Sequence, residues 1–223
     1  MSFSGGKDST AMLLRMIEEN MKIDEIIFLD TGVEFPEMYN HIKQVEEYIG
    51  RPITKLKDEH SFEYYMLEHV KTRGKNKGQK GYSWSDFRNR WCTSNLKKKV
   101  IKRYLRKYKD YRIIEYHGMA FDEPKRIKDD PNIKYPLFEW KMVEKDALQY
   151  CYDRGFTWGG LYEKFDRLSC FCCPLKSLKE LEILYREFPH LWSKLREWDS
   201  KTYRQFRADY SILDLEEKFN KKK

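Results

Sequence analysis

The chain opens with a glycine pair, Gly5-Gly6, between a short apolar stretch that ends at Phe3 and a helical pattern over 10–14. Glycine adopts backbone angles that are closed to other residues, so the amides of such a loop can point at one place. The start of the following helix adds unpaired amides and the positive end of its dipole. A strand, a glycine loop and a helix start in this order predict an anion-binding site.

The side chains of this loop agree with that prediction. Hydroxyls are present at Ser4, Ser9 and Thr10, and Lys7 adds a full positive charge, so the segment suits phosphate, pyrophosphate or sulfate. It is not the G-x-x-x-x-G-K-[ST] loop, because its two glycines are adjacent. The alternative is a plain turn before a capped helix, which the number of donor-bearing residues around the glycines disfavours.

Apolar runs and helical patterns alternate along most of the chain. Strands are predicted at Phe3, Glu25–Leu29, Ile53 and Arg112–Tyr116, and helices at Pro36–Ile49, Ser61–Val70, Asn95–Tyr108 and Glu144–Arg154. This alternation implies a parallel sheet flanked by helices, with ligands outside the carboxyl ends of the strands. Helical patterns at Ser177–Phe188 and His190–Arg207 then predict a helical appendage. We expect an α/β domain over residues 1–175 and a C-terminal helical appendage over residues 176–223.

The amino-acid composition indicates the cellular compartment of the protein. The 223 residues contain no apolar run near the roughly 20 residues that span a bilayer, and no signal peptide is recognisable at the start. The cysteines are five in number, which without a secretion signal favours metal-binding or catalytic roles over disulfides. We therefore expect a cytoplasmic protein that does not bind membranes.

The formal net charge of +8 is concentrated in two basic runs. The first, Lys71–Lys80, overlaps the glycine-bearing segment Arg73–Tyr82, which could close over a substrate as a lid or be only a disordered loop. The second spans Lys97–Lys109 and also carries an apolar stripe, so it suits either nucleic-acid contact or a solvated helix face.

The segment SGGKDST resembles the PP-loop of the adenine nucleotide alpha-hydrolase superfamily, and the chain resembles the phosphoadenosine phosphosulfate (PAPS) reductase family within it. Five further segments agree in order: FLDTGVEFPEMY (28–39), RWCTSNLKKK (90–99), HGMAFDEPKR (117–126), YPLFEW (135–140) and GLYEKFDRLSCFCCP (160–174). The resemblance implies a Rossmann-like fold for residues 1–175. The strand before the loop is shorter than the family pattern, since only three residues precede Ser4.

The resemblance also implies a site for an adenine nucleotide, either ATP or an adenylylsulfate (APS) or PAPS type of molecule. The expected binding residues are Ser4, Gly5, Gly6, Lys7, Asp8, Ser9, Thr10, Asp30, Thr31, Gly32, Gly118 and Glu123, and the expected catalytic residues are Lys7, Asp8 and Arg126. Asp30 and Asp8 are candidates for holding Mg²⁺, although Asp30 also suits a ribose hydroxyl or a simple turn. Arg126 either grips an anionic group or pairs with Glu123 on the surface.

Four cysteines form the candidate metal site. The layout of Cys92, then Cys170, Cys172 and Cys173 after a long gap, resembles the iron–sulfur members of the family, which implies a 4Fe-4S cluster. Those members carry a cysteine pair where this chain has only Cys92, so the fourth ligand is either Cys172 or a non-protein ligand. A four-thiolate zinc site needs the same ingredients. The fifth, Cys151, shares a helical face with Leu148 and is predicted to lie in the core.

Three functions fit these features. The first is ATP-dependent adenylation of an acceptor coupled to sulfur transfer, with tRNA or DNA as the acceptor and a sulfur or thiol donor protein as partner. The second is an APS or PAPS reductase that releases sulfite, which ranks lower because no cysteine follows Cys173 where the family's reductases carry E-C-G-[LI]-H. The third is a non-catalytic nucleotide- or nucleic-acid-binding iron–sulfur protein. The sequence is also compatible with a homo-oligomer.

Overall fold

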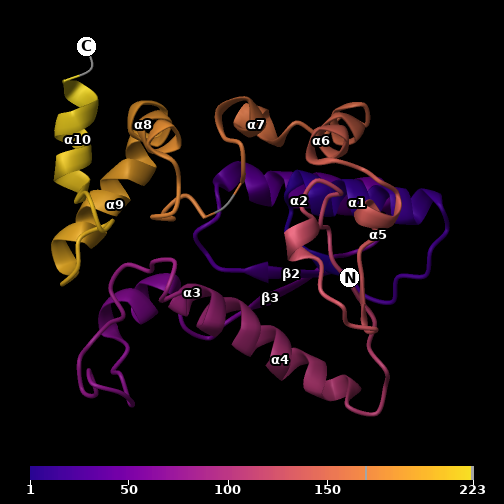
Figure 1. Ribbon diagram of the computed structural model, residues 1–223, viewed down its shortest axis with the longest axis horizontal. Helices are drawn as coiled ribbons and strands as arrows, with labels where there is room; N and C mark the ends of the chain where they lie inside the picture. Colours follow the sequence, from indigo (N-terminus) through magenta and orange to yellow (C-terminus); the bar gives the residue numbers. More distant parts are fainter. Residues whose placement is uncertain (169, 222–223) are drawn as a thin grey trace. The chain divides into compact units, whose positions relative to one another are not determined.

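The computed structural model describes residues 1–168 and 170–221 (Figure 1). These residues form two compact units. Unit 1 contains residues 1–30, 35–56 and 100–168, and unit 2 contains residues 31–34, 57–99 and 170–221. The predicted division between residues 175 and 176 stays a prediction, since each of these units is built from segments that are far apart in sequence.

A parallel sheet forms the centre of unit 1. Its strands are β1 (Ser2–Phe3), β2 (Ile27–Asp30) and β3 (Thr54–Lys57), in the order β1-β2-β3. Strands β1 and β2 run parallel with Phe3 opposite Phe28. Their carboxyl ends therefore meet at one edge, which places the glycine loop and Asp30 at the same end of the sheet.

Helices cover this sheet because each has one apolar face. The helices with residues in unit 1 are α1 (Lys7–Glu18), α2 (Pro36–Ile49), α4 (Lys99–Leu105), α5 (Pro136–Glu139), α6 (Glu144–Tyr152) and α7 (Leu161–Lys164), with 3-10 turns η3 (Arg106–Tyr108), η4 (Pro124–Arg126) and η5 (Trp158–Gly160). Helix α1 buries Leu13 and Leu14 and packs against α6. Figure 1 shows α1 and α6 on one side of the strands and α4 on the other. The predicted α/β class with short parallel strands flanked by helices is confirmed.

The fourth predicted strand differs from expectation. Only β4 (Glu115–Tyr116) forms from the predicted Arg112–Tyr116, and it pairs in parallel with the unpredicted β5 (Ile133–Lys134) in a separate two-stranded sheet. Within the described residues, β1 does not pair with the segment before β4. A cavity of about 220 Å³, lined by Ser2 and Ile114 among others, lies there instead. The two-residue β1 is too short to recruit another neighbour along its length.

Unit 2 is helical and rich in tryptophan. Its elements are η1 (Tyr64–Glu68) and η2 (Ser94–Lys98), both π-helical, and α3 (Trp91–Thr93), α8 (Leu178–Glu187), α9 (Pro189–Lys201) and α10 (Ile212–Asn220). Helices α8 and α10 each begin with a capping box, built on Ser177 and Ser211. Trp84, Trp198 and Phe206 are almost completely buried in its core.

Three helix predictions need correction. The helix expected over Ser61–Val70 ends at Glu68, because Val70 pairs with Lys80 at the base of a hairpin. The helix expected from Asn95 begins at Trp91 and passes through the π-helical η2. The helix expected over His190–Arg207 ends at Lys201, and α10, which was not predicted, follows a loop. In the described part of the chain, no helix combines the length and apolar character that a membrane crossing needs.

The packing of α9 makes a stability prediction. Leu195 is completely buried in unit 2, so Leu195→Ala should lower the free energy of unfolding by about 2–5 kcal/mol through lost contacts and a residual cavity. The matched control is Leu213→Ala on α10, where the side chain is 58% exposed and the change should stay within about 0.5 kcal/mol. Urea titration followed by tryptophan fluorescence measures both, and equal losses would contradict this account of the core.

Candidate functional site

The glycine loop between β1 and α1 is fixed by bonds to its own residues and to η5. The Ser9 hydroxyl accepts from the Ser4 amide at 3.1 Å and donates to the Gly6 carbonyl at 3.0 Å. Gly5 has a φ of 78°, which favours glycine, and its carbonyl accepts from the Trp158 indole at 2.7 Å. The loop therefore holds one shape without a ligand.

The first turn of α1 presents open backbone donors. The Lys7 amide donates to the Tyr162 hydroxyl at 2.7 Å, and the Thr10 amide donates to the Gly6 carbonyl. Within residues 1–168 and 170–221, the amides of Asp8 and Ser9 have no acceptor. Two adjacent free amides at the positive end of a helix are the donors that an oxyanion needs.

A buried contact of Thr10 with His41 stabilises the loop. Its side chain is fully buried, and its hydroxyl lies 3.0 Å from Nε2 of His41. The His41 ring stacks on Trp158, with centroids 4.3 Å apart, and burial lowers the pKa of His41 to about 3. The imidazole is therefore neutral at physiological pH. The hydroxyls of Ser9 and Thr10 form contacts within the protein, and their predicted contact with a nucleotide stays a prediction.

Lys7 is buried and paired. Its Nζ lies 2.5 Å from Oε2 of Glu144, at the start of α6, and 3.4 Å from Oδ2 of Asp8. An arriving anion would compete with Glu144 for this ammonium group. Sequence analysis missed Glu144, which nothing in the pattern marks, and Tyr162, which stands in the quoted GLYEK segment without any distinguishing feature.

Asp8 combines burial with neighbouring charge. The pKa of Asp8 is raised to about 6: burial is the largest cause, the carboxylates of Glu144 and Glu123 also raise it, and Lys7 lowers it. Its Oδ1 is shielded from solvent and has no hydrogen-bond partner within the described residues. The other Mg²⁺ candidate, Asp30, accepts a hydrogen bond from Tyr39 at 2.8 Å through its Oδ1.

The segment after β4 approaches the loop closely. A Cβ added to Gly118 would lie 3.0 Å from the Ser9 amide nitrogen, so only glycine fits there without a shift. Glu123 influences the pKa of Asp8 and forms an ion pair with Arg126. The surface pair considered for these two residues is therefore present, and contact between Arg126 and a nucleotide stays a prediction.

The turn after β2 belongs to unit 2 and lies beside a cysteine. The Thr31 hydroxyl donates to Glu34 at 2.8 Å and lies 3.6 Å from the Cys170 sulfur. Gly32 has a φ of 75°. The expected contact of Thr31 and Gly32 with the nucleotide is therefore neither shown nor excluded by this position, and both stay predictions.

The four candidate ligand cysteines all lie in unit 2 as free thiols. Burial raises the pKa of Cys172, and Cys170, Cys173 and Cys92 raise it further, so the four sulfur atoms influence one another electrostatically. Lys176 is buried beside them, and the charges of three of these thiols oppose the lowering of its pKa by burial.

This donor set suits a thiolate-bound group with a lysine to balance its charge. Among the described residues, however, no three His, Cys, Asp or Glu side chains are arranged to hold a metal ion, so the metal site stays a prediction. Cys151 is different, since it is completely buried beneath the Lys7 carbonyl, which confirms its predicted place in the core.

The raised pKa of Asp8 predicts a pH dependence of anion binding. As pH falls through about 6, protonation removes a negative charge beside the open amides, so sulfate should bind more tightly, by about fivefold for about 1 kcal/mol. Sulfate keeps both charges over this range, and His41 stays neutral. In Asp8→Asn, affinity should stay at the tighter level. Calorimetric titration tests both proteins, and an unchanged pH profile in Asp8→Asn would contradict the assignment.

Comparison with known proteins agrees with this geometry. The uncharacterized protein MJ0066 of Methanocaldococcus jannaschii is 30% identical over 90% of this chain and 42% of its own length. The uncharacterized protein MJ0973 of the same organism is 27% identical over 86% of this chain and 45% of its own length. The uncharacterized nin region protein ORF290 of Escherichia phage lambda is 27% identical over 66% of this chain and 56% of its own length. The chain thus spans about half the length of these relatives.

The family match covers the glycine loop, the segment after β4 and the cysteines together. Residues 1–176 match the phosphoadenosine phosphosulfate reductase domain, which is most of the chain. The short parallel strands flanked by helices are consistent with the Rossmann-like fold of that domain. The chain belongs to the phosphoadenosine phosphosulfate reductase family of the PP-loop superfamily, whose members include nucleotide-binding enzymes.

Proposed function

We propose that this protein binds ATP at the glycine loop, adenylates an acceptor with release of pyrophosphate, and then transfers sulfur to that acceptor. The observation that carries the proposal is the pair of open amides at Asp8 and Ser9, with the Lys7 ammonium beside them. These groups suit the phosphates of a nucleotide, since the helix start and the lysine both favour negative charge.

The chemistry follows from these donors. An acceptor oxygen attacks the α-phosphorus of ATP, the bond to the bridging oxygen breaks, and pyrophosphate leaves with the electron pair. Lys7 would exchange Glu144 for the leaving group, and Arg126 would exchange Glu123. Stabilising charge on a leaving group is often the largest catalytic contribution. Mg²⁺ held by Asp8 would share that charge.

The cysteines would serve the second step. Cys92, Cys170, Cys172 and Cys173 would hold a 4Fe-4S cluster, or zinc as the alternative, and a cluster would supply a place to bind the sulfur atom that is transferred. Sulfide-level sulfur from the donor would then bond to the carbon that carries the adenylated oxygen, and the carbon–oxygen bond would break as AMP leaves with the electron pair. The free thiols suit a reducing compartment, so the proposal includes the cytoplasm.

Burial favours this role of the cysteines over the reductase alternative. A reductase needs a thiolate that attacks the sulfur of APS or PAPS, and burial raises the pKa of Cys170, Cys172 and Cys173. Buried thiols with raised pKa values are poor nucleophiles, whereas metal binding deprotonates them. The same observation applies to a non-catalytic iron–sulfur protein, so turnover must separate these two functions.

Turnover tests the loop. With ATP, Mg²⁺, a sulfur donor and tRNA or DNA acceptors, the protein should form AMP and pyrophosphate, and Lys7→Met should slow this by about 100-fold or more. The control is Lys22→Met, a lysine with an 85% exposed side chain, which should behave as wild type. Unchanged ATP with every acceptor would refute the adenylation step, and sulfite release from PAPS would favour the reductase.

Metal content tests the cysteines. Protein purified without oxygen should be brown and contain iron and sulfide, and Cys172→Ala should lose both. The matched control is Cys151→Ala, which removes an equally buried thiol and should keep the cluster. Elemental analysis and the visible spectrum measure this outcome. Colourless protein with stoichiometric zinc would replace the cluster with the zinc alternative.

A further inference from the structure

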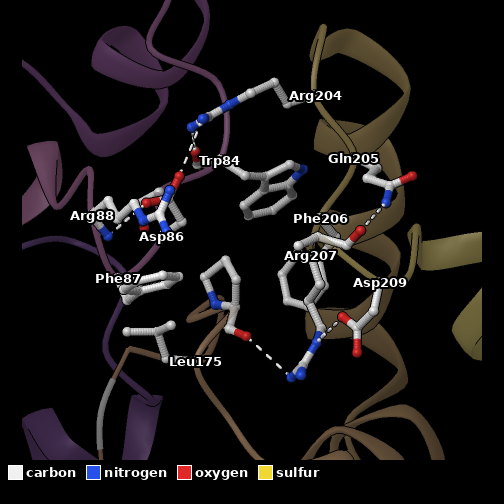
Figure 2. Close-up of a pocket in the computed structure, with 13 residues that line it drawn as sticks. Trp84, Asp86, Phe87, Arg88, Leu175, Arg204, Gln205, Phe206, Arg207 and Asp209 are labelled. Atoms are coloured by element: carbon white, nitrogen blue, oxygen red, sulfur yellow. Dashed lines mark hydrogen bonds and ion pairs between the residues drawn. The ribbon is translucent and has the colours of Figure 1, made fainter.

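Unit 2 contains a pocket of about 750 Å³ that the proposed nucleotide site does not use (Figure 2). Trp84 and Phe206 form its buried part and meet edge to face, with ring centroids 4.8 Å apart. Phe87 and Leu175 also line it, yet they are 70% and 52% exposed. The volume is large enough for a nucleotide, and the exposed ring offers a flat apolar surface.

The charges around this pocket leave one cation available. Arg204 pairs with Asp86 at 3.2 Å and Arg207 pairs with Asp209 at 3.0 Å, as the dashed lines in Figure 2 show. The guanidinium of Arg88 instead stands 5.1 Å from the centre of the Phe87 ring. The Arg88 amide donates to the Asp86 carboxylate at 2.8 Å, but among the described residues the Arg88 guanidinium has no acidic partner. An exposed aromatic ring and an available arginine therefore stand together at the pocket.

A basic hairpin (residues 70–80) is joined to the wall of this pocket. It closes through the bridge between Val70 and Lys80, and it contains five Lys or Arg residues and no Asp or Glu. At its base, Lys71 donates to the Tyr203 hydroxyl at 2.7 Å, and Tyr203 directly precedes the pocket residue Arg204. Tyr203 thus links the base of the hairpin to the pocket wall, and we treat the hairpin and the pocket as one candidate binding surface of unit 2.

We infer that this surface binds a single-stranded nucleic acid and that the pocket takes one unstacked nucleotide of it. The base lies against Phe87 and Leu175, its phosphate pairs with Arg88, and flanking phosphates contact the basic hairpin. Every base has a face that stacks on an aromatic ring, and a cationic groove follows the backbone. An acidic peptide would use the cations but not the stacking surface.

This inference rests on the proposed function for one point, namely that the acceptor is a nucleic acid. It deepens that function by placing the nucleotide next to the candidate sulfur-carrying group. Pro174 and Leu175 line the pocket and directly follow Cys173 in the chain. A base held there would lie against residues that directly follow the cysteine segment in the chain.

The test uses the full chain and fluorescently labelled single strands of about 12 nucleotides, one of DNA and one of RNA with matching sequence. Fluorescence anisotropy at several salt concentrations gives the affinity and the salt slope. Phe87→Ala should weaken binding about tenfold with the slope unchanged, since one stacked base is lost. Arg88→Gln should reduce the slope by about one, since one phosphate contact is lost.

The matched control is Tyr111→Ala, because Tyr111 is another exposed ring followed by an arginine, and this variant should bind as wild type. A duplex of the same sequence should bind more weakly and ignore Phe87→Ala. The inference is overturned if Phe87→Ala binds both strands as wild type, if Tyr111→Ala loses as much affinity, or if polyglutamate displaces the strands and itself binds in a Phe87-dependent way.

Binding of ATP by the same proteins separates this inference from the proposed function. Phe87→Ala should bind ATP as wild type does, because Phe87 is not among the residues proposed to hold ATP. If wild type binds the strands through Phe87 but does not bind ATP, the proposed function fails and the nucleic-acid site stands. The tighter of the DNA and RNA strands identifies the class of acceptor.

Discussion

The start of helix α1 is the feature on which the rest of unit 1 depends. Its first amides and the glycines before it must keep their direction without a ligand, because donors that are already in place cost no reorganisation when charge develops. The Trp158 indole donates to the Gly5 carbonyl, and the Tyr162 hydroxyl accepts from the Lys7 amide. His41 lies within hydrogen-bond distance of the Thr10 hydroxyl. In the part of the chain that the structure describes, the amides of Asp8 and Ser9 at the start of this helix have no acceptor.

The cations around this loop are paired with carboxylates. The buried ammonium of Lys7 would be costly alone, and Glu144 and Asp8 satisfy it. Glu123 and Arg126 extend the same arrangement outward. A phosphate group that enters such a site replaces one carboxylate partner with another anion, so the site needs no large rearrangement. Lys176 has a related position beside the thiols of unit 2, where a thiolate-bound group would supply the opposite charge.

Local sequence rules predicted the elements whose causes are local. The glycine loop, the helix between Pro36 and Gly50, and the capped helix after Ser177 follow from turn, proline and capping residues that a single segment contains. No local pattern marked the π-helical segments or β5. Helix α10 was missed although Ser211 and Asp214 form a local capping box at its start.

The sequence likewise predicted some residues of the candidate site and missed others. Lys7, Asp8 and Gly118 were found because glycine and charge stand out in a short motif. Glu144 and Tyr162 were missed because a glutamate at a helix start and a tyrosine among apolar residues are ordinary until the fold brings them to the loop. The Phe87 and Arg88 pair was missed for the opposite reason, since exposure of an aromatic ring cannot be read from sequence.

The backbone passes from one unit to the other several times, for example between Asp30 and Thr31 and again between Glu34 and Phe35. Neither unit is therefore a continuous stretch of polypeptide. A truncation that removed one would also sever the other, and a protease could not release either as a single intact fragment.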